Sequence, residues 1–230
     1  MRDYFLYGFA AIAAMLLTWN LHHIFIDLPP VIQNVGAYKI VYMHVSIILA
    51  SFIGFFVSLA ASSIYLATGN LKYDAFAAGV TEVAVVYATA GLALGSLWGR
   101  FAWGIWWTWD ARLTSMLICW LMYLGYLMLR QAIPEPTERA RLCAVLSIFG
   151  GVGVTFVYKS IEWYRTQHPA PVLSFRQGAG GMGPGLETPI YWNLLALLFL
   201  GTAMIMVRMR QEQVSREIDA LRRIAHSHAA

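Results

Sequence analysis

The stretch Val41 to Leu66, VYMHVSIILASFIGFFVSLAASSIYL, decides the fold of this chain. It contains no aspartate, glutamate, lysine or arginine, and its apolar residues form a continuous run without an amphipathic period. A helix of roughly 20 apolar residues matches the thickness of the hydrocarbon core of a bilayer. The stretch is therefore predicted to be a transmembrane helix.

Five further apolar runs are long enough to span a bilayer as helices. They are Tyr4 to Phe25, Ala75 to Leu97, Leu113 to Leu129, Leu142 to Val157 and Tyr191 to Val207. Of the 230 residues, 59% are hydrophobic and only 12% are charged, and the mean hydropathy is +0.59. A soluble domain could not cover so much apolar surface with so few charges. We therefore predict an all-α membrane protein with six transmembrane helices.

The distribution of lysine and arginine predicts how the helices are oriented, because these residues are enriched in cytoplasmic loops. One set of helix ends carries Arg2, Lys72, Arg130, Arg139, Arg141, Arg208, Arg210, Arg216, Arg222 and Arg223. The opposite set carries Lys39, Arg100, Arg112, Lys159, Arg165 and Arg176. The richer set predicts that both termini are cytoplasmic. The segments that then face the outer side of the membrane are Ile26 to Ile40, Trp98 to Arg112 and Tyr158 to Ile190.

This layout divides the chain into a six-helix domain, residues 1–210, and a cytoplasmic tail, residues 211–230. On a helix, one face of the tail would carry Val214, Ile218, Leu221 and Ala225. That face can dock on a partner or on the lipid surface, although a short solvated helix explains the pattern equally well. The formal net charge of +4 does not predict nucleic-acid binding, because the basic residues form no single patch.

The most unusual segment is WGRFAWGIWWTWDARLTS, residues 98–115, which contains five of the nine tryptophans. These are Trp98, Trp103, Trp106, Trp107 and Trp109, and Asp110 and Arg112 follow at once. An interfacial belt needs only one or two tryptophans at each helix end. Indole faces stack on extended π systems, and each Nε1–H can donate a hydrogen bond. The segment therefore predicts a platform for a large, flat, amphipathic ligand.

Charged residues in the same segment indicate that this ligand carries carboxylates. Arg100 and Arg112 can each bind a carboxylate through two parallel hydrogen bonds. Asp110 can either orient Arg112 or cap the helix that begins beside it.

Two of the six histidines are candidate ligands of a metal. His44 lies about one turn inside an apolar run, where an ionisable residue is costly and is a functional candidate. His168 lies in the predicted outer segment after the fifth helix. Two neutral imidazoles on opposite faces of a porphyrin would give six-coordinate iron without a covalent bond to the ring. His22 and His23, at the end of the first helix, are a weaker alternative pair.

Two smaller features are expected to be structural. Cys119 and Cys143 lie inside apolar runs and belong to no CxxC or CxxCH motif, which argues against zinc, thiol redox chemistry and covalent haem attachment. We expect both thiols to be buried as small apolar side chains. Lys159 and Glu162 have the spacing of a local ion pair on a helix.

Three parts of the sequence together resemble one known family over nearly the whole chain. They are the tryptophan-rich segment, the Met43–His44 pair at the head of the second helix, and EWYRTQH at residues 162–168. The family is haem exporter protein C, also called cytochrome c maturation protein C (CcmC), a group of haem-handling membrane proteins. This chain departs from the family pattern in HVSI, residues 44–47, where a proline often follows the histidine.

The resemblance implies that a non-covalent haem b is held between His44 and His168 on the periplasmic side of a bacterial inner membrane. It also implies that the platform contacting the haem or its acceptor consists of Trp98, Trp103, Trp106, Trp107, Trp109 and Asp110. The implied partners are components A, B and D of an ATP-binding cassette complex and a periplasmic haem chaperone, component E, which receives haem for c-type cytochrome biogenesis. The chain is not expected to be an enzyme. It contains no phosphate-binding Gly–Lys–Ser/Thr loop, so ATP hydrolysis would come from the partner complex.

Two other functions are compatible with the sequence. A b-type cytochrome that anchors a quinone enzyme would use haem for electron transfer, but such proteins usually hold haem between facing helices near the middle of the membrane. A permease that binds no haem would leave the density of tryptophans unexplained. The predicted place of His168 in a connecting segment favours haem transfer over electron transfer.

Overall fold

Six long helices dominate the computed structural model, which describes residues 2–28, 35–164, 166–168 and 187–229. They are α1 (Arg2–His22), α2 (Val35–Thr68), α3 (Leu71–Trp103), α4 (Ala111–Ala132), α5 (Pro136–Trp163) and α6 (Thr188–Ala229), and a short π-helical turn, η1 (His23–Asp27), follows α1. Each of the six α-helices is long and apolar enough to cross a bilayer. The prediction of an all-α membrane protein with six transmembrane helices is confirmed.

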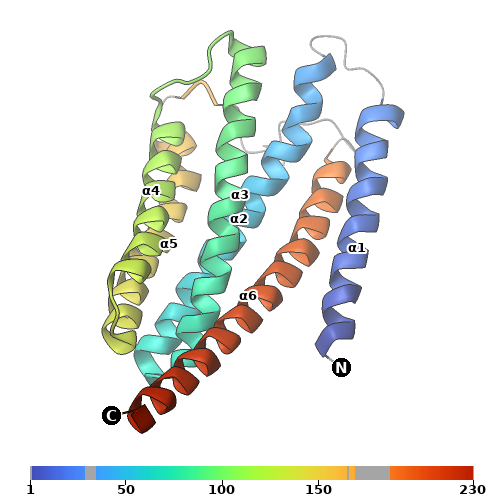
Figure 1. Cartoon of the computed structure of the whole chain (residues 1–230). Coiled ribbons are helices and arrows are strands. Elements are labelled where there is room, and N and C mark those ends of the chain that lie inside the picture. Colours follow the sequence, from blue (N-terminus) through green and yellow to red (C-terminus); the bar gives the residue numbers. More distant parts are fainter. Residues whose placement is uncertain (1, 29–34, 165, 169–186, 230) are drawn as a thin grey trace.

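Helix α2 lies at the centre of the bundle (Figure 1). It packs against α3, α5 and α6, while α1 packs against α6 and α4 against α5. Glycines between membrane helices let the backbones approach closely. A Cβ atom at Gly54 of α2 would lie 2.8 Å from the Cβ atom of Ala84, and one at Gly91 of α3 would lie 2.4 Å from Cδ1 of Ile48. The α2–α3 contact therefore depends on small residues from both helices.

Buried hydroxyl groups connect three helices in the middle of the bundle. The Ser58 hydroxyl on α2 lies 2.6 Å from Thr81 Oγ1 on α3 and 3.0 Å from Ser147 Oγ on α5. Polar groups in hydrocarbon need partners within the protein, because no water is available there. These contacts satisfy the three hydroxyls and help to fix α2, α3 and α5 relative to one another.

The end of the bundle that holds the termini carries ion pairs between helices. Asp74 of α3 accepts two hydrogen bonds from Arg130 of α4, at 2.6 and 3.1 Å, and both side chains are largely buried. Arg210 of α6 pairs with Asp3 of α1, so the start of the chain lies beside the C-terminal half of α6. Both termini lie at the lower end of the molecule in Figure 1.

All six helices extend beyond the apolar runs that predicted them, and the extensions of α3 and α6 change the structure expected for two segments. Helix α3 continues past Leu97 to Trp103 and ends where Gly104 adopts a left-handed conformation with φ of +78°. Glycine is the usual residue at this position because it has no Cβ atom to strain the left-handed backbone. Trp98 therefore lies on a helix, within the segment expected outside the membrane. Helix α6 similarly continues to Ala229 through the residues assigned to the tail.

The structure confirms the buried cysteines and the local ion pair that the sequence predicts. Cys119 and Cys143 are buried, with 1% and 0% of their surface exposed. Lys159 Nζ lies 2.9 Å from Glu162 Oε2 at the end of α5, which is the predicted local ion pair.

Candidate functional site

His44 projects from α2 towards the backbone of α3. Its Nδ1 atom lies 2.9 Å from the carbonyl oxygen of Gly91. A carbonyl oxygen can only accept a hydrogen bond, so in the neutral imidazole Nδ1 carries the proton and Nε2 carries the lone pair. The contact thus fixes the tautomer that presents Nε2 as a metal ligand, an arrangement common among metal-binding histidines.

Gly95, one helical turn after Gly91, makes room for the His44 ring. A Cβ atom at Gly95 would lie 2.7 Å from Cε1 of His44, which is closer than real Cβ atoms approach. Glycine at this position therefore lets the imidazole approach α3 closely.

His168 lies beyond the end of α5 and is surrounded by indole rings. Its ring centroid is 6.2 Å from that of Trp98 and 6.2 Å from that of Trp103. The two indoles contact each other edge to face, with centroids 4.9 Å apart and planes at 76°. Helix α3 continues to Trp103, so one helix holds both tryptophans beside His168. We call the described residues 166–168 the histidine-bearing segment.

His44 and His168 line the same cavity. The cavity has a volume of about 30 Å³, and its other walls are apolar side chains of α2 to α5 together with Arg112. The Arg112 Nη1 atom is buried and has no hydrogen-bond partner among the described residues. The structure therefore brings together two imidazoles and the guanidinium of Arg112, whose Nη1 atom has no partner among the described residues.

The size of this cavity limits what it can hold. A volume of about 30 Å³ has room for no more than one or two water molecules. A porphyrin placed between His44 and His168 would require the two histidines to separate, and His168 lies in a connecting segment whereas His44 lies within a long helix. Because α2 packs against α3, α5 and α6, the bundle fixes the position of His44.

Asp110 makes two different contacts at the start of α4. Its Oδ1 atom accepts a hydrogen bond from the backbone N–H of Leu113 at 2.8 Å, so Asp110 is the N-cap of the helix, one of the two roles predicted for it. Its Oδ2 atom accepts a hydrogen bond from the hydroxyl of Thr166. Asp110 thus connects α4 to the segment that carries His168.

The remaining predicted platform residues, like Trp98, Trp103 and Asp110, do not line the cavity. Trp106 and Trp109 are exposed, at 58% and 76% of their surface. Trp107 packs edge to face on Trp109 with centroids 5.8 Å apart, and its Nε1 atom is buried without a partner among the described residues. Arg100 donates a hydrogen bond to the carbonyl oxygen of Gly104, so its guanidinium is directed at the end of its own helix.

The alternative histidine pair forms a separate group. His23 Nδ1 lies 3.3 Å from Asp27 Oδ2, and His22 Nδ1 lies 3.6 Å from the same oxygen. The His23 ring also stacks on Trp19, with centroids 5.9 Å apart. Neither histidine lines the cavity that contains His44 and His168.

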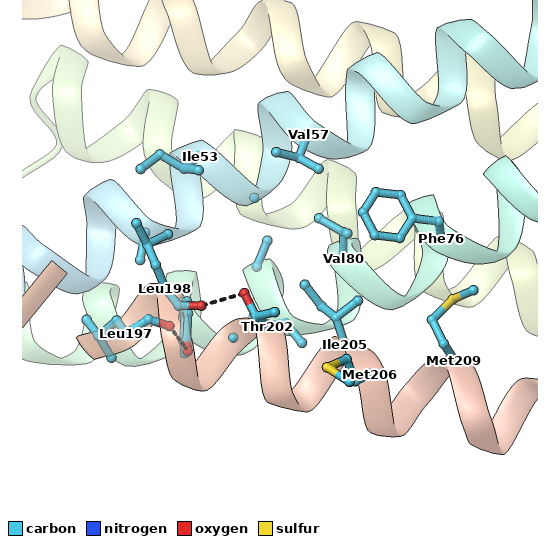
Figure 2. Close-up of a pocket in the computed structure, with 16 residues that line it drawn as sticks. Ile53, Val57, Phe76, Val80, Leu197, Leu198, Thr202, Ile205, Met206 and Met209 are labelled. Carbon is cyan, nitrogen blue, oxygen red and sulfur yellow. Dashed lines mark hydrogen bonds between the residues drawn. The ribbon is translucent and has the colours of Figure 1, made fainter. Parts of the chain in front are cut away.

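A larger groove lies between α2, α3 and α6 (Figure 2). Its volume is about 420 Å³, and its 16 lining residues include no histidine, lysine or arginine. Both hydroxyls in its wall are engaged within the protein: Tyr87 donates to the Leu197 carbonyl and Thr202 to the Leu198 carbonyl, each at 2.8 Å. Despite its size, the groove lacks the imidazoles and the cation that the smaller cavity provides. We therefore take the smaller cavity as the candidate site.

Sequence reasoning missed three contributors to this site. Gly91 and Gly95 support the His44 ring, and their spacing of one helical turn on α3 was the available signal. Thr166 was missed although it stands two residues before His168, a spacing at which threonine hydroxyls often bind the backbone. In the structure the His168 N–H lies 3.0 Å from the Thr166 hydroxyl oxygen.

Comparison with known proteins decides the family. The family model described as "Heme exporter protein C" matches residues 1–224. The chain belongs to the haem exporter protein C family. A protein of that name from Bradyrhizobium diazoefficiens is 32% identical over 86% of this chain and 75% of its own length. The Rhodobacter capsulatus protein is 33% identical over 84% and 80%, and the Escherichia coli K12 protein is 29% identical over 77% and 71%.

Membership of the haem exporter protein C family confirms the resemblance on which the sequence prediction rested. The match extends across the tryptophan-rich segment and both candidate histidines, because it begins at residue 1 and ends at residue 224. The six membrane-spanning helices fit a multi-pass membrane protein of this family.

Proposed function

We propose that this chain binds haem at the periplasmic face of the bacterial inner membrane and presents it to a periplasmic haem chaperone during c-type cytochrome biogenesis. The observation that carries the proposal is the shared cavity of His44, His168 and Arg112. We infer that the ligand is haem because the relatives are called haem exporter proteins. The chain would act as a binding and transfer component and not as an enzyme.

The proposed axial ligands of the haem iron are His44 and His168. The Gly91 carbonyl selects the tautomer of His44 in which Nε2 carries the lone pair, as a ligand to iron requires. The indoles of Trp98 and Trp103 lie close enough to His168 to contact a porphyrin bound beside it. The haem would be haem b, held without a covalent bond, since the sequence contains no CxxCH motif.

Arg112 is the stronger of the two proposed partners for the haem propionates. Its guanidinium lines the cavity and has a buried nitrogen without a partner among the described residues. A carboxylate would satisfy that nitrogen through a charge-assisted hydrogen bond. Arg100 can bind a propionate only by giving up its hydrogen bond to the Gly104 carbonyl, so we propose it as the weaker partner.

The periplasmic placement of the site rests on the distribution of charge. The site lies at the end of the bundle opposite the termini, and the helix ends near the termini carry the larger number of arginines. Lysine and arginine favour the cytoplasmic side. The tryptophan-rich segment between α3 and α4 would then face the periplasm, and both termini would lie in the cytoplasm.

Two kinds of protein partner are proposed: a periplasmic haem chaperone and a membrane-bound ATP-binding cassette complex. Exposed Trp106 and Trp109 are suited to contact the chaperone, component E, because tryptophan is enriched at protein interfaces. An ATP-binding cassette complex, with components A, B and D, would supply the energy for release. This sequence has no phosphate-binding loop of its own.

A haem-transfer assay tests the function. Haem-loaded protein in detergent is mixed with apo chaperone, and the haem absorption of each is followed after separation. We expect haem to move to the chaperone, and we expect a variant with both His22→Ala and His23→Ala to behave like wild type. Haem that stays on the chain, yet is reduced rapidly by a quinol, would overturn the proposal in favour of the b-type cytochrome.

A further inference from the structure

The hydroxyl of Thr166 makes two hydrogen bonds in different directions. It donates to Asp110 Oδ2, and its oxygen accepts the backbone N–H of His168 at 3.0 Å. A single hydroxyl can do both, because it has one proton and two lone pairs. The backbone of His168 is thereby tied to a carboxylate on another part of the chain.

The carboxylate itself is held firmly. The other oxygen of Asp110 accepts the Leu113 N–H at 2.8 Å, which places Asp110 at the start of α4. Arg112, on the first turn of the same helix, lines the cavity together with His44 and His168. The first turn of α4 therefore positions one wall of the cavity directly and the histidine-bearing segment through Thr166.

This connection matters because the histidine-bearing segment has little helical support of its own. Helix α5 ends at Trp163, so His168 lies five residues beyond it. The ring contacts with Trp98 and Trp103 are made by the side chain, whereas the Thr166 bonds fix the backbone. Without the Asp110–Thr166 bond, the segment keeps its ring contacts but loses its charge-assisted tie to α4.

We propose that Thr166 is a positioning residue for haem: its hydrogen bond to Asp110 ties the backbone of His168 to the first turn of α4, so that His168 stays beside the cavity that it shares with His44. The inference rests on the proposed function. The cavity of about 30 Å³ must widen to take a porphyrin, and the Asp110–Thr166 bond limits how far the backbone of His168 can move away from α4 as it does so. Thr166 would therefore control how long haem is retained, while His44 continues to bind the iron from the other side.

The test compares Thr166→Val with Thr166→Ser in the full-length, haem-loaded protein. Valine removes the hydroxyl while keeping the size and β-branching of the side chain, and serine restores the hydroxyl. A charge-assisted hydrogen bond corresponds to a change of about tenfold or more in an equilibrium constant. We expect Thr166→Val to release haem to apomyoglobin about tenfold faster or more, and Thr166→Ser to release it at nearly the wild-type rate.

Spectroscopy separates loss of position from loss of fold. We expect Thr166→Val to shift ferric haem from low spin towards high spin, as the His168 bond is lost, and free imidazole to restore the low-spin spectrum. Thr202→Val is the matched control, because Thr202 bonds only to the Leu198 carbonyl of its own helix in the described structure, and it should leave spectrum and rate unchanged. If Thr166→Val does not fold, Thr166→Ala, which also lacks the hydroxyl, replaces it.

The outcomes distinguish the two proposals. If wild type gives no six-coordinate haem spectrum, the proposed function fails. If wild type gives that spectrum and Thr166→Val keeps both its spin state and its release rate, the role of Thr166 is wrong while the proposed function stands. A Thr166→Ser variant as impaired as Thr166→Val would also overturn the role of the hydroxyl.

Discussion

His44 Nδ1 lies 2.9 Å from the Gly91 carbonyl oxygen, and the position four residues further along α3, Gly95, has no side chain to block the ring. One helix thus supplies both the hydrogen-bond acceptor that selects the tautomer of the histidine and the space that its ring occupies. Burying an imidazole in a membrane helix is costly unless its polar atoms are satisfied. This paired arrangement on α3 explains how α2 can carry a histidine within an apolar stretch.

Gly95→Ala should displace the His44 ring and weaken haem binding. The new Cβ atom would lie 2.7 Å from Cε1 of His44, so the ring must turn or the helices must separate. We expect the haem dissociation constant, measured by titration and absorption spectroscopy, to rise at least several-fold. Gly125→Ala is the control, because a Cβ atom at Gly125 meets nothing within 4 Å, and it should bind haem like wild type. Equal affinity of Gly95→Ala and wild type would show that the ring position does not matter.

Arg112→Ala should weaken binding of haem but not of its dimethyl ester, which lacks the carboxylates. Loss of a charge-assisted hydrogen bond corresponds to a change of about tenfold or more in the dissociation constant of haem. Arg100→Ala should have a smaller effect, because Arg100 already donates to the Gly104 carbonyl. The dissociation constants of haem and of its dimethyl ester are measured for each variant, and the difference between the two porphyrins gives the contribution of the carboxylates. An equal loss for haem and ester would mean that Arg112 supports the fold and not the propionate.

The tryptophans should separate into two functional groups. Trp98→Ala and Trp103→Ala, beside His168, are expected to change the haem absorption spectrum and lower haem content. Trp106→Ala and Trp109→Ala, which remove exposed rings, are expected to leave haem content unchanged and to slow transfer to the chaperone. Haem content by pyridine haemochrome and the transfer rate are measured for all four. A uniform loss of haem would contradict this division.

The Asp74–Arg130 pair should be required for stability and not for haem ligation. Asp74→Ala leaves a largely buried guanidinium without its carboxylate, which typically costs about 3–5 kcal/mol. Glu162→Gln, which breaks the exposed pair with Lys159, should cost about 1 kcal/mol or less. Thermal unfolding in detergent compares the two. The folded fraction of Asp74→Ala should retain the wild-type haem spectrum. A melting temperature for Asp74→Ala equal to that of Glu162→Gln would contradict the structural role of the pair.

The sequence predicted the six helices because each span is a long apolar run, and bilayer thickness makes such runs unambiguous. It did not predict where α3 ends, because the last turns from Trp98 to Trp103 are held by packing and by Gly104, which hydropathy does not register. The cap at Asp110 was one of two predicted roles and is present. The helices that continue past the apolar runs show that hydropathy marks the span and not the full helix.

The candidate site was predictable in composition but not in arrangement. His44, His168 and Arg112 stood out by residue type and position, and the structure places them around one cavity. Arg100 looked equivalent to Arg112 in the sequence, yet one guanidinium turns to its own helix end while the other is buried beside the histidines. Thr166 and Gly95 escaped notice because their roles depend on contacts between segments far apart in the chain, which their local spacing alone does not identify.

The most direct test of the central claim is the electron paramagnetic resonance spectrum of ferric haem bound to wild type, His44→Ala and His168→Ala. We predict a low-spin signal from two imidazole ligands in wild type and a high-spin signal in each variant, returned to low spin by added imidazole. An unchanged low-spin signal in either variant would show that the substituted histidine does not bind the iron, and the proposed ligand pair would be wrong.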